Sequence, residues 1–484
     1  MDTSKQRFQQ MLDLATVALF MALIMAPMVA MWFSTSTEQR ADDSEKRTLA
    51  STPSRPRSWS EAVRWPDEAD AFLRDRFGFR TALSRWHSRL LYAVFRTSSS
   101  PKVVIGRDGW LYYNGGPEDG RPIVDYRGAE PLSPAQLEWL RWMIQDQHEW
   151  LRERGIQYLF VIVPSKEQIH PEHLPPAITR VGPRTPREQL LDHVTGRGLP
   201  VLDLAPALRE AGRQAPVFYK TDTHWNTYGC LVASRAILNA LGRPAEADDA
   251  FELRTVKQYV GDLALMLNLG AFLSETVDER IPRAPRRGNP RAVDSRDSPD
   301  VVGGVDDPTL PRAVVYRDSF TESLIPLLTD HFREVRYVWA RYGKDMKNAP
   351  DLKPDIVLQI MADRALRTSV KYSPDIQQER LRQRVDADSQ LVWRLDAWTA
   401  ELPPPRDARS HLPVLQVDIT ARRPTVLKLT WGKSGEAGYR VQQGRGRVFL
   451  PVFDPDAAPP FRFQVGGQED DFEIHSLELR EIVR

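Results

Sequence analysis

Ala313-Val-Val-Tyr-Arg-Asp-Ser-Phe320 places a serine, Ser319, shortly after a short apolar run. The run from Ala313 to Tyr316 is typical of a strand that is covered on both faces of a sheet. A serine hydroxyl is a weak nucleophile unless a base lies within hydrogen-bond reach. Ser319 is therefore a candidate nucleophile, and the alternative role is the N-cap of a following helix.

A second stretch, Lys220-Thr-Asp-Thr-His-Trp-Asn-Thr-Tyr-Gly229, places Asp222 and His224 two residues apart. The usual base for a serine nucleophile is an imidazole that a carboxylate holds in one tautomer. We interpret Ser319, His224 and Asp222 as an acyl-transfer centre. A single histidine is more often a surface or satisfied core residue, and spacing alone does not separate the two roles.

Predicted strands and helices alternate around these stretches, as in an α/β fold with an open, doubly wound parallel sheet. Such sheets bind ligands at the carboxyl ends of their strands, where Ser319 and Lys166 should both lie. Residues 279–312 are rich in Pro, Arg, Asp and Gly, and we expect a surface excursion outside the sheet. The expected strands are 158–163, 199–204, 313–316, 335–339 and 355–360, and the expected helices include about 187–194, 227–241 and 319–331.

Leu14 to Phe33 is an almost wholly apolar run of 20 residues. At ~1.5 Å per residue, such a run covers roughly 30 Å, the thickness of a bilayer core. Lys5 and Arg7 precede it, which predicts the N-terminus inside the cytoplasm and the rest of the chain outside. We expect residues 1–40 to be an uncleaved, single-pass transmembrane anchor. A cleaved signal peptide is the alternative.

The composition excludes some classes of protein. Lys and Arg number 66 against 65 Asp and Glu, so nucleic-acid binding, which needs basic clusters, is not indicated. The single cysteine, Cys230, excludes an intramolecular disulfide framework and a zinc site built from several cysteines. The 484 residues suggest two or three domains.

After Pro403–Pro405 the apolar pattern changes to a period of two, for example at Leu415, Val417 and Ile419. Several short strands separated by Gly and Pro predict a β-sandwich, jelly-roll-like, over residues 406–484. Residues 41–400 would then form the α/β domain. The β-sandwich could be a carbohydrate-binding module, and a stabilising or partner-docking domain is the alternative.

A series of motifs in a fixed order resembles the SGNH-hydrolase-like domain of the alginate O-acetyltransferase proteins of bacterial exopolysaccharide machinery. The resemblance covers about residues 45–370. One departure is Arg317, which stands where a Gly-Asp-Ser motif has glycine. The motifs are Glu45-Lys-Arg-Thr-Leu-Ala50, Asp75-Arg-Phe-Gly-Phe-Arg80, Gly106-Arg-Asp-Gly-Trp-Leu111, Val163-Pro-Ser-Lys166, Asp222-Thr-His-Trp-Asn226, Gly261-Asp-Leu263 and Asp318-Ser-Phe320.

This resemblance implies a periplasmic enzyme that O-acetylates a secreted polysaccharide, with Ser319 as nucleophile, His224 as base and Asp222 as its orienting carboxylate. It also implies a membrane-embedded partner protein that delivers the acetyl group; no cofactor or metal is expected. Lys166, Trp225 and Arg364 are candidates for contact with sugar or donor, with a purely structural role as the alternative. Two other functions stay open, a polysaccharide acetyl esterase with the same triad and a non-catalytic polysaccharide-binding scaffold.

Overall fold

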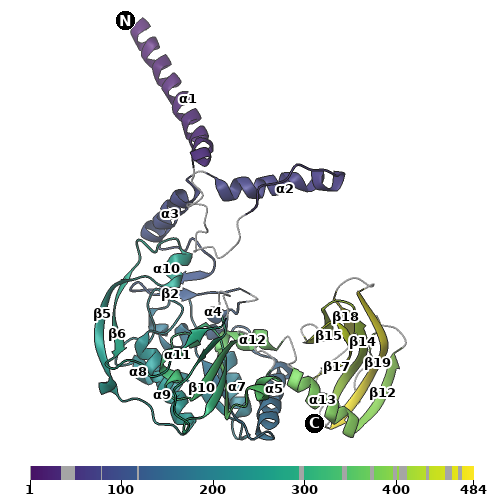
Figure 1. Ribbon diagram of the computed structural model, residues 1–484. Helices are drawn as coiled ribbons and strands as arrows, with labels where there is room; N and C mark the ends of the chain where they lie inside the picture. The colour runs from purple at the N-terminus through teal and green to yellow at the C-terminus, as the bar shows by residue number, and fades with distance from the viewer. Residues whose placement is uncertain are drawn as a thin grey trace. The chain divides into compact units, whose positions relative to one another are not determined.

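A computed structural model of the chain is shown in Figure 1. The chain divides into two compact units, which are described separately. The first unit comprises Met1–Tyr112, Lys220–Thr223 and Lys257–Thr276, and the second comprises Tyr113–Tyr219, His224–Val256 and Val277–Arg484. The structure describes residues 2–33, 50–77, 79–116, 119–293, 299–340, 346–370, 375–395, 401–402, 411–431, 435–452, 461–466 and 471–483.

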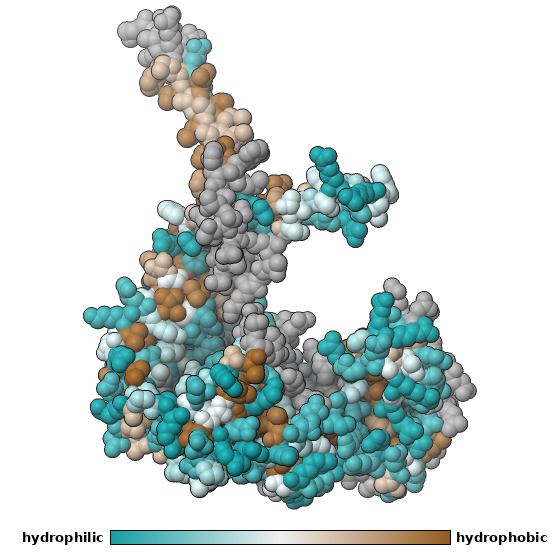
Figure 2. All heavy atoms as spheres, viewed as in Figure 1, coloured by the Kyte–Doolittle hydropathy of each residue, from teal (hydrophilic) through white to brown (hydrophobic). Residues whose placement is uncertain are grey.

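The first unit begins with a long apolar helix, α1 (Asp2–Phe33). Within it, Phe8–Pro27 is a stretch of 20 residues that is long and apolar enough to cross a membrane. Its apolar side chains are exposed along the helix (Figure 2). This finding agrees with the predicted anchor by length and composition. The charge and prolines of residues 41–60 also predict a linker after the anchor. Residues 41–49 lie outside the described residues, and α2 begins within this range, at Trp59.

The first unit also contains further short helices and strands, some of which come from later in the chain. A helical segment forms α3 (Arg80–Leu90) and continues as a π-helical turn, η1 (Leu91–Phe95). The remaining elements are α2 (Trp59–Arg76), α10 (Asp262–Met266) and the strand pair β1 (Val103–Ile105) and β2 (Leu111–Tyr113). A second strand pair, β5 (Phe251–Tyr259) and β6 (Glu275–Pro282), runs across the division between the units.

The second unit is built on a seven-stranded sheet of order β4-β3-β11-β9-β10-β8-β7. The first five strands are parallel: β4 (Val201–Asp203), β3 (Gln157–Val163), β11 (Ile356–Ala362), β9 (Arg312–Arg317) and β10 (Glu334–Trp339). Consecutive residues of β3, β9 and β11 are buried, so both faces of the sheet are covered. The mixed α/β character of the prediction is confirmed.

Helices of the second unit connect these strands. The start of α5 (Pro134–Arg152) carries a capping box: the Ser133 side chain accepts a hydrogen bond from the Gln136 backbone N–H, and the Gln136 side chain accepts one from the Ser133 backbone N–H. The other helical elements are α4 (Pro122–Arg127), α6 (Lys166–Ile169), η2 (Pro171–His173), α7 (Pro186–Val194), α8 (Ala205–Gly212), α9 (Thr227–Ala240), η3 (Asp248–Ala250), η5 (Ala349–Leu352), η6 (Asp363–Ala365), α12 (Leu366–Ser369) and α13 (Asp375–Ala387).

The expectation of a wholly parallel sheet was wrong, because part of the supposed surface excursion joins it. Strand β8 (Val301–Gly303) pairs antiparallel with β10, and β7 (Arg291–Ala292) pairs antiparallel with β8. Edge strands of this length are held by backbone hydrogen bonds and need few apolar side chains. The low apolar content of 279–312 therefore concealed them.

The helix expected over 319–331 was also wrong. Ser319–Thr321 forms a single 3₁₀ turn, η4, and α11 covers only Ile325–Thr329. The break has two local causes. The Asp318 side chain caps the 3₁₀ turn by accepting a hydrogen bond from the Phe320 backbone. Pro326, which has no N–H to donate, stands in the first turn of α11, where helices tolerate proline.

The C-terminal region contains two four-stranded antiparallel sheets. One has the order β12-β19-β14-β17 and the other β13-β18-β15-β16. That these sheets form a β-sandwich stays a prediction, and so does the domain boundary at 406. Two strands of these sheets, β12 and β13, lie before residue 406 in the chain. The strands are β12 (Ser389–Leu395), β13 (Glu401–Leu402), β14 (His411–Ala421), β15 (Thr425–Trp431), β16 (Gly435–Val441), β17 (Gly444–Pro451), β18 (Phe461–Val465) and β19 (Phe472–Val483).

Candidate active site

The candidate nucleophile lies at the carboxyl end of β9, a central strand of the seven-stranded sheet. β9 ends at Arg317, and Ser319 opens the 3₁₀ turn η4 two residues later. Asp318 between them has an extended backbone, with φ −113° and ψ −165°. Ser319 is half-buried. The serine is therefore presented at the sheet edge where parallel α/β sheets bind their ligands.

The structure brings the candidate base to this serine. His224 Nε2 lies 2.9 Å from Ser319 Oγ, although the two residues are 95 positions apart in the chain. His224 lies in a tight reversal, closed by an antiparallel bridge between Phe218 and Trp225. The helix α9 begins soon after it and is capped by Asn226, whose side chain accepts a hydrogen bond from Gly229 N at 3.0 Å. This hydrogen-bond distance is what nucleophile–base catalysis requires.

An aromatic cluster supports the imidazole. The ring of Phe320, which is buried, meets the His224 ring edge-on at a centroid distance of 5.0 Å. The same ring contacts Trp225 at 5.2 Å and Phe218 at 6.4 Å, also edge-on. Edge-to-face contacts of this kind fix the relative orientation of the rings. Phe320 thus connects the nucleophile turn to the reversal that carries His224.

The carboxylate of Asp318 holds the nucleophile turn in place. One oxygen accepts a hydrogen bond from Phe320 N at 3.0 Å, and the other accepts one from Ala362 N at 2.8 Å. Burial raises the pKa of Asp318, and these two backbone donors and the nearby cation of Arg364 oppose that rise. The Asp318-Ser-Phe320 motif includes this residue, but nothing in the sequence indicates its role as a clamp.

Arg317, the departure from the glycine of the family motif, is accommodated without strain. Its side chain is wholly buried and donates hydrogen bonds to Glu322 at 2.6 Å and to the Pro299 carbonyl at 2.7 Å. Its guanidinium also lies over the Trp339 ring, 5.2 Å from the centroid. Because Arg317 ends a regular strand and Asp318 is extended, a positive φ is not needed before the serine, and glycine is not required there.

Asp222 belongs to the first unit, where two donors orient its carboxylate. The Tyr259 hydroxyl and the Asp262 backbone N–H each donate to Asp222 Oδ2 at 3.0 Å. Burial and the Asp222 carboxylate raise the pKa of Tyr259, so this phenol stays a proton donor. That Asp222 in turn orients His224, two residues along the chain, stays a prediction.

The segment around Asp222 is fixed by the Gly261-Asp-Leu263 motif. Asp262 Oδ1 accepts hydrogen bonds from the Thr223 backbone at 2.7 Å and from its hydroxyl at 3.0 Å. A Cβ at Gly261 would come within 2.3 Å of the Thr221 carbonyl, so only glycine fits there. Glu275 completes this frame by accepting a hydrogen bond from Thr221 N at 2.8 Å. Sequence reasoning had found the motif through the family resemblance, but only the structure gives its physical role.

The three candidate substrate contacts differ in position. Arg364 is half-buried at the carboxyl end of β11, where its guanidinium lies over the rings of Tyr113 at 5.1 Å and Phe320 at 5.6 Å. Lys166 is buried and donates to the Tyr219 carbonyl at 2.9 Å. Trp225 is wholly buried against Phe320. The burial of Lys166 and Trp225 favours the structural alternative for both, whereas Arg364 lies close to the nucleophile turn.

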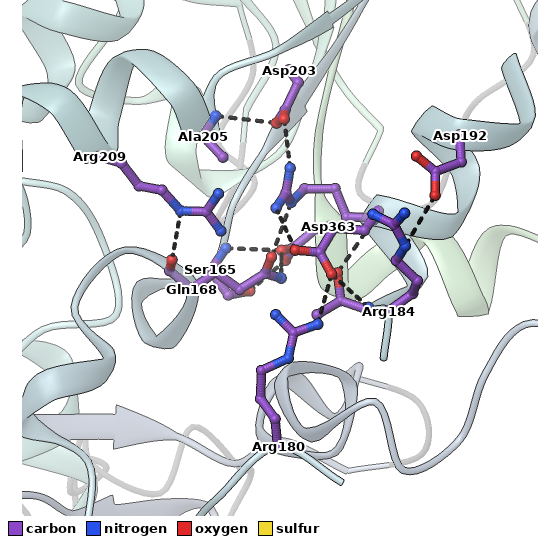
Figure 3. Close-up of polar contacts among 12 residues, drawn as sticks. Ser165, Gln168, Arg180, Arg184, Asp192, Asp203, Ala205, Arg209 and Asp363 are labelled. Carbon is purple, nitrogen blue, oxygen red and sulfur yellow. Dashed lines mark hydrogen bonds and ion pairs between the residues drawn. The ribbon is translucent and has the colours of Figure 1, made fainter. Parts of the chain in front are cut away.

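A network of buried polar groups joins the ends of β3 and β11 (Figure 3). The Asp363 carboxylate accepts hydrogen bonds from the Ser165 backbone at 3.0 Å and from the side chains of Ser165 and Gln168. Arg187 donates to Gln168 at 2.9 Å and pairs with Asp203. These contacts fix the ends of β3 and β11, and β11 lies directly beside β9, the strand that precedes Ser319.

Glu167 is a wholly buried carboxyl group next to this network. Burial and the neighbouring Asp363 raise the pKa of Glu167 to about 8. Among the described residues, its Oε1 has no hydrogen-bond partner. A carboxyl group in this state is held neutral at physiological pH. No pattern in the sequence distinguished Glu167 from a surface glutamate.

The comparison with known families agrees with this geometry. Residues 103–323, which include Ser319, His224 and Asp222, match the family model described as "SGNH hydrolase-like domain, acetyltransferase AlgX". This part of the chain is thus similar to an SGNH hydrolase-like acetyltransferase domain, and the resemblance that the motifs indicated is confirmed. The C-terminal sheets lie outside the matched segment.

The curated relatives carry the name of a probable alginate O-acetylase. A protein of Pseudomonas putida named "probable alginate O-acetylase AlgJ" is 31% identical over 183 residues, which are 36% of this chain and 44% of that protein. The protein of the same name in Pseudomonas aeruginosa is 29% identical over 237 residues, which are 46% of this chain and 54% of that protein. The chain spans about half the length of the curated relatives it matches. Among solved structures, Bacillus cereus PatB1 is 19% identical with a TM-score of 0.41, covering 56% of this chain and 97% of that one.

Proposed function

We propose that this protein is a polysaccharide O-acetyltransferase that passes an acetyl group through Ser319 to a sugar hydroxyl. The observation that supports this most directly is the 2.9 Å distance between His224 Nε2 and Ser319 Oγ. A nucleophile and a base at this distance, at the carboxyl edge of a parallel sheet, suit acyl transfer. The acetyltransferase domain to which residues 103–323 are similar gives the acyl group its identity.

In the first half-reaction, Ser319 Oγ attacks the carbonyl carbon of a donor acetyl ester while its proton passes to His224 Nε2. The tetrahedral intermediate collapses, the donor oxygen leaves with the proton from His224, and acetyl-Ser319 remains. The Ser319 backbone N–H is our candidate oxyanion donor. Such donors typically contribute about 3 kcal/mol to transition-state stabilisation.

In the second half-reaction, His224 Nε2 takes the proton of a sugar hydroxyl, whose oxygen attacks the acetyl-Ser319 carbonyl. The ester bond to Ser319 breaks, and His224 returns the proton to Ser319 Oγ. Asp222 is proposed to hold the imidazole in the tautomer with Nε2 free to accept. Arg364, over the Phe320 ring, is our candidate for contact with the acceptor or donor, because its cation suits an acidic or hydroxyl-rich sugar.

The setting of this reaction is also a proposal. The apolar helix α1 would anchor the chain in the inner membrane with the catalytic domain in the periplasm. Because acetyl-CoA is not expected there, a membrane-embedded partner would supply the acetyl group. The two C-terminal sheets would form a β-sandwich that holds the polysaccharide, and a stabilising or partner-docking role is the alternative.

The test uses the full chain in detergent micelles with 4-nitrophenyl acetate as donor and oligomannuronate as acceptor. Mass spectrometry follows acetyl on Ser319 and on the sugar. The matched control for Ser319→Ala is Ser323→Ala, because Ser323 is an exposed serine just after the same turn. We expect acetylated sugar from the wild type and from Ser323→Ala, and none from Ser319→Ala.

Other outcomes would favour the other functions. Release of acetate without acetylated sugar, across acceptors that include neutral oligosaccharides, would favour an esterase that uses water as acceptor. Glycan binding that is unchanged by Ser319→Ala, without acetyl on Ser319 from any donor, would favour a non-catalytic scaffold. Transfer to a neutral oligosaccharide in preference to oligomannuronate would retain the transferase and exclude mannuronate as its substrate.

A further inference from the structure

The region that contains α3 and η1 is unusually basic for this chain. Residues 76–107 contain seven Lys and Arg residues and no Asp or Glu, whereas the whole chain has 66 basic and 65 acidic residues. A segment of this kind has a strong positive potential. The concentration of charge therefore belongs to one short stretch and not to the protein as a whole.

One face of this helical segment packs on the first unit through small and polar side chains. Ser84 accepts a hydrogen bond from Asn268 at 3.1 Å, and Ser88 donates one to Ser99 at 2.8 Å. Further along, the buried Tyr92 meets Phe272 edge-on at 6.1 Å. These residues follow one another at the spacing of a single helical face.

The other face of the segment carries its large apolar side chains, and they point to solvent. A spacing of three or four residues places them on one stripe. An ordinary surface helix does the reverse, burying its apolar stripe and exposing its polar residues. The stripe on α3 consists of Leu83 (54% exposed), Trp86 (70%) and Leu90 (44%), and exposed apolar side chains flank it at the left-handed N-cap Phe79 (54%) and, in η1, at Val94 (63%) and Phe95 (62%).

The exposed apolar stripe indicates that another surface binds to this face of the segment. A contiguous exposed apolar stripe marks an interaction site, since single exposed apolar residues are common but a full helical face is not. Arg85, Arg89 and Arg96 on the same segment are exposed, and the guanidinium groups of Arg89 and Arg96 lie over the rings of Phe272 and Tyr92. The occupant must therefore offer an apolar surface bordered by negative charge.

We propose that α3 and η1 lie in the interface of an anionic lipid bilayer, with the stripe in the acyl boundary and the arginines at the headgroups. An apolar stripe with aromatic residues and a basic border is the composition of helices that lie in a membrane surface. The same chain carries the apolar helix α1, which ends at Phe33, upstream of α3 at Arg80. The inference rests on the proposed membrane location and is independent of the proposed acetyl transfer.

The test places a fluorophore beside the stripe, in the full chain. Val94→Cys is labelled with an environment-sensitive dye in a Cys230→Ala background and reconstituted into vesicles of equal parts phosphatidylcholine and phosphatidylglycerol that contain doxyl-labelled lipid. The matched control is Leu253→Cys, an exposed apolar position in the second unit. We expect quenching and a blue shift at position 94 and neither at position 253.

The charge requirement is tested at Arg85, which is exposed. Charge reversal by Arg85→Glu should reduce quenching at position 94, and Arg85→Lys should retain it. Vesicles of phosphatidylcholine alone should give less quenching than anionic ones. Equal quenching in both kinds of vesicle would overturn the anionic assignment.

Two further results would overturn the proposal. One is an unquenched label at position 94 in vesicles that retain the protein after an alkaline wash, because the anchor is then inserted and the stripe is not. The other is a label protected in native membranes but unquenched in pure lipid, which would assign the stripe to a protein partner. Release of the protein by the wash would instead contradict the proposed membrane anchor. Acetyl transfer to sugar is measured in a separate assay, so a failure of the membrane proposal is distinguishable from a failure of the proposed function.

Discussion

The carboxylate of Asp318 accepts a hydrogen bond from the Ala362 backbone N–H at 2.8 Å, and so joins the turn that carries the nucleophile to the end of the neighbouring strand β11. Its second oxygen accepts from Phe320 N at 3.0 Å within the turn itself. The residue before the candidate nucleophile is thus a buried clamp between two strand ends. This clamp fixes the turn without the glycine that the family motif carries one residue earlier.

Asp318→Asn should therefore weaken both stability and catalysis. The amide keeps one acceptor oxygen but turns an NH₂ group toward the second backbone N–H, which is left unsatisfied. We expect a loss of about 1–3 kcal/mol in the free energy of unfolding, measured by chemical denaturation. With the 4-nitrophenyl acetate assay, kcat should fall more than KM rises, because the position of Ser319 is lost and binding is not. Asp306→Asn, at an exposed carboxylate, is the control and should change neither.

Asp222→Asn tests the proposed orienting carboxylate. If Asp222 fixes the tautomer of His224, kcat for acetyl-ester turnover should fall by roughly 10²- to 10⁴-fold with KM nearly unchanged. Tyr259→Phe removes one of the donors to Asp222 and keeps the carboxylate, so its loss should be much smaller, about ten-fold or less. An equal loss of kcat in both variants would contradict the proposed role of the Asp222 carboxylate. It would indicate that the loss comes from disturbing the loop around Asp222.

Glu167 should make stability depend on pH. Its pKa in the folded protein is raised to about 8 from an ordinary 4.5. Its stabilising contribution is therefore complete below the ordinary pKa and is lost as pH rises toward 8, because the unfolded chain releases a proton that the folded protein retains. In Glu167→Gln this contribution is absent. Between pH 5 and 8 the free energy of unfolding of the wild type should fall relative to the variant, by up to about 1.4 kcal/mol per pH unit.

The measurement for Glu167 is denaturant unfolding across that pH range. Titration of distant carboxyl groups is common to both proteins and cancels in the difference, whereas that of the neighbouring Asp363 is coupled to Glu167 and contributes to it. Parallel curves for wild type and Glu167→Gln would mean that Glu167 is already ionised in the folded protein.

Gly261→Ala should disrupt the frame around Asp222. The added Cβ would meet the backbone of Thr221 at 2.3 Å, and backbone cannot move aside as a side chain can. We expect a loss of more than about 2 kcal/mol in stability, with a loss of turnover, by thermal unfolding and the ester assay. Gly446→Ala is the matched control, because a Cβ there meets nothing within 4 Å. Similar losses of stability and turnover in both variants would contradict this explanation, because the clash with Thr221 exists only at Gly261.

Much of the fold could be predicted from local patterns. The continuous apolar runs at 158–163, 313–316 and 355–360 became β3, β9 and β11, since strands buried on both faces need apolar residues at every position. The short antiparallel strands β8 and β7, of which β7 is the edge of the sheet, escaped prediction because their pairing depends on backbone groups and little on apolar side chains. The helix expected after Ser319 failed for a related reason: a side-chain cap and a proline, acting locally, outweighed the apolar pattern.

By itself, the sequence determined the residue types of the site, their order in the chain and the strand end at which the serine lies, because these follow from periodicity and motif. The tertiary structure decided which groups meet. It placed His224 against Ser319 across 95 residues, buried Trp225 and Lys166, and made Asp318 a clamp. It also turned the apolar stripe of α3 outward. A hydrogen bond and a burial state depend on segments far apart in the chain, and local spacing carries no information about them.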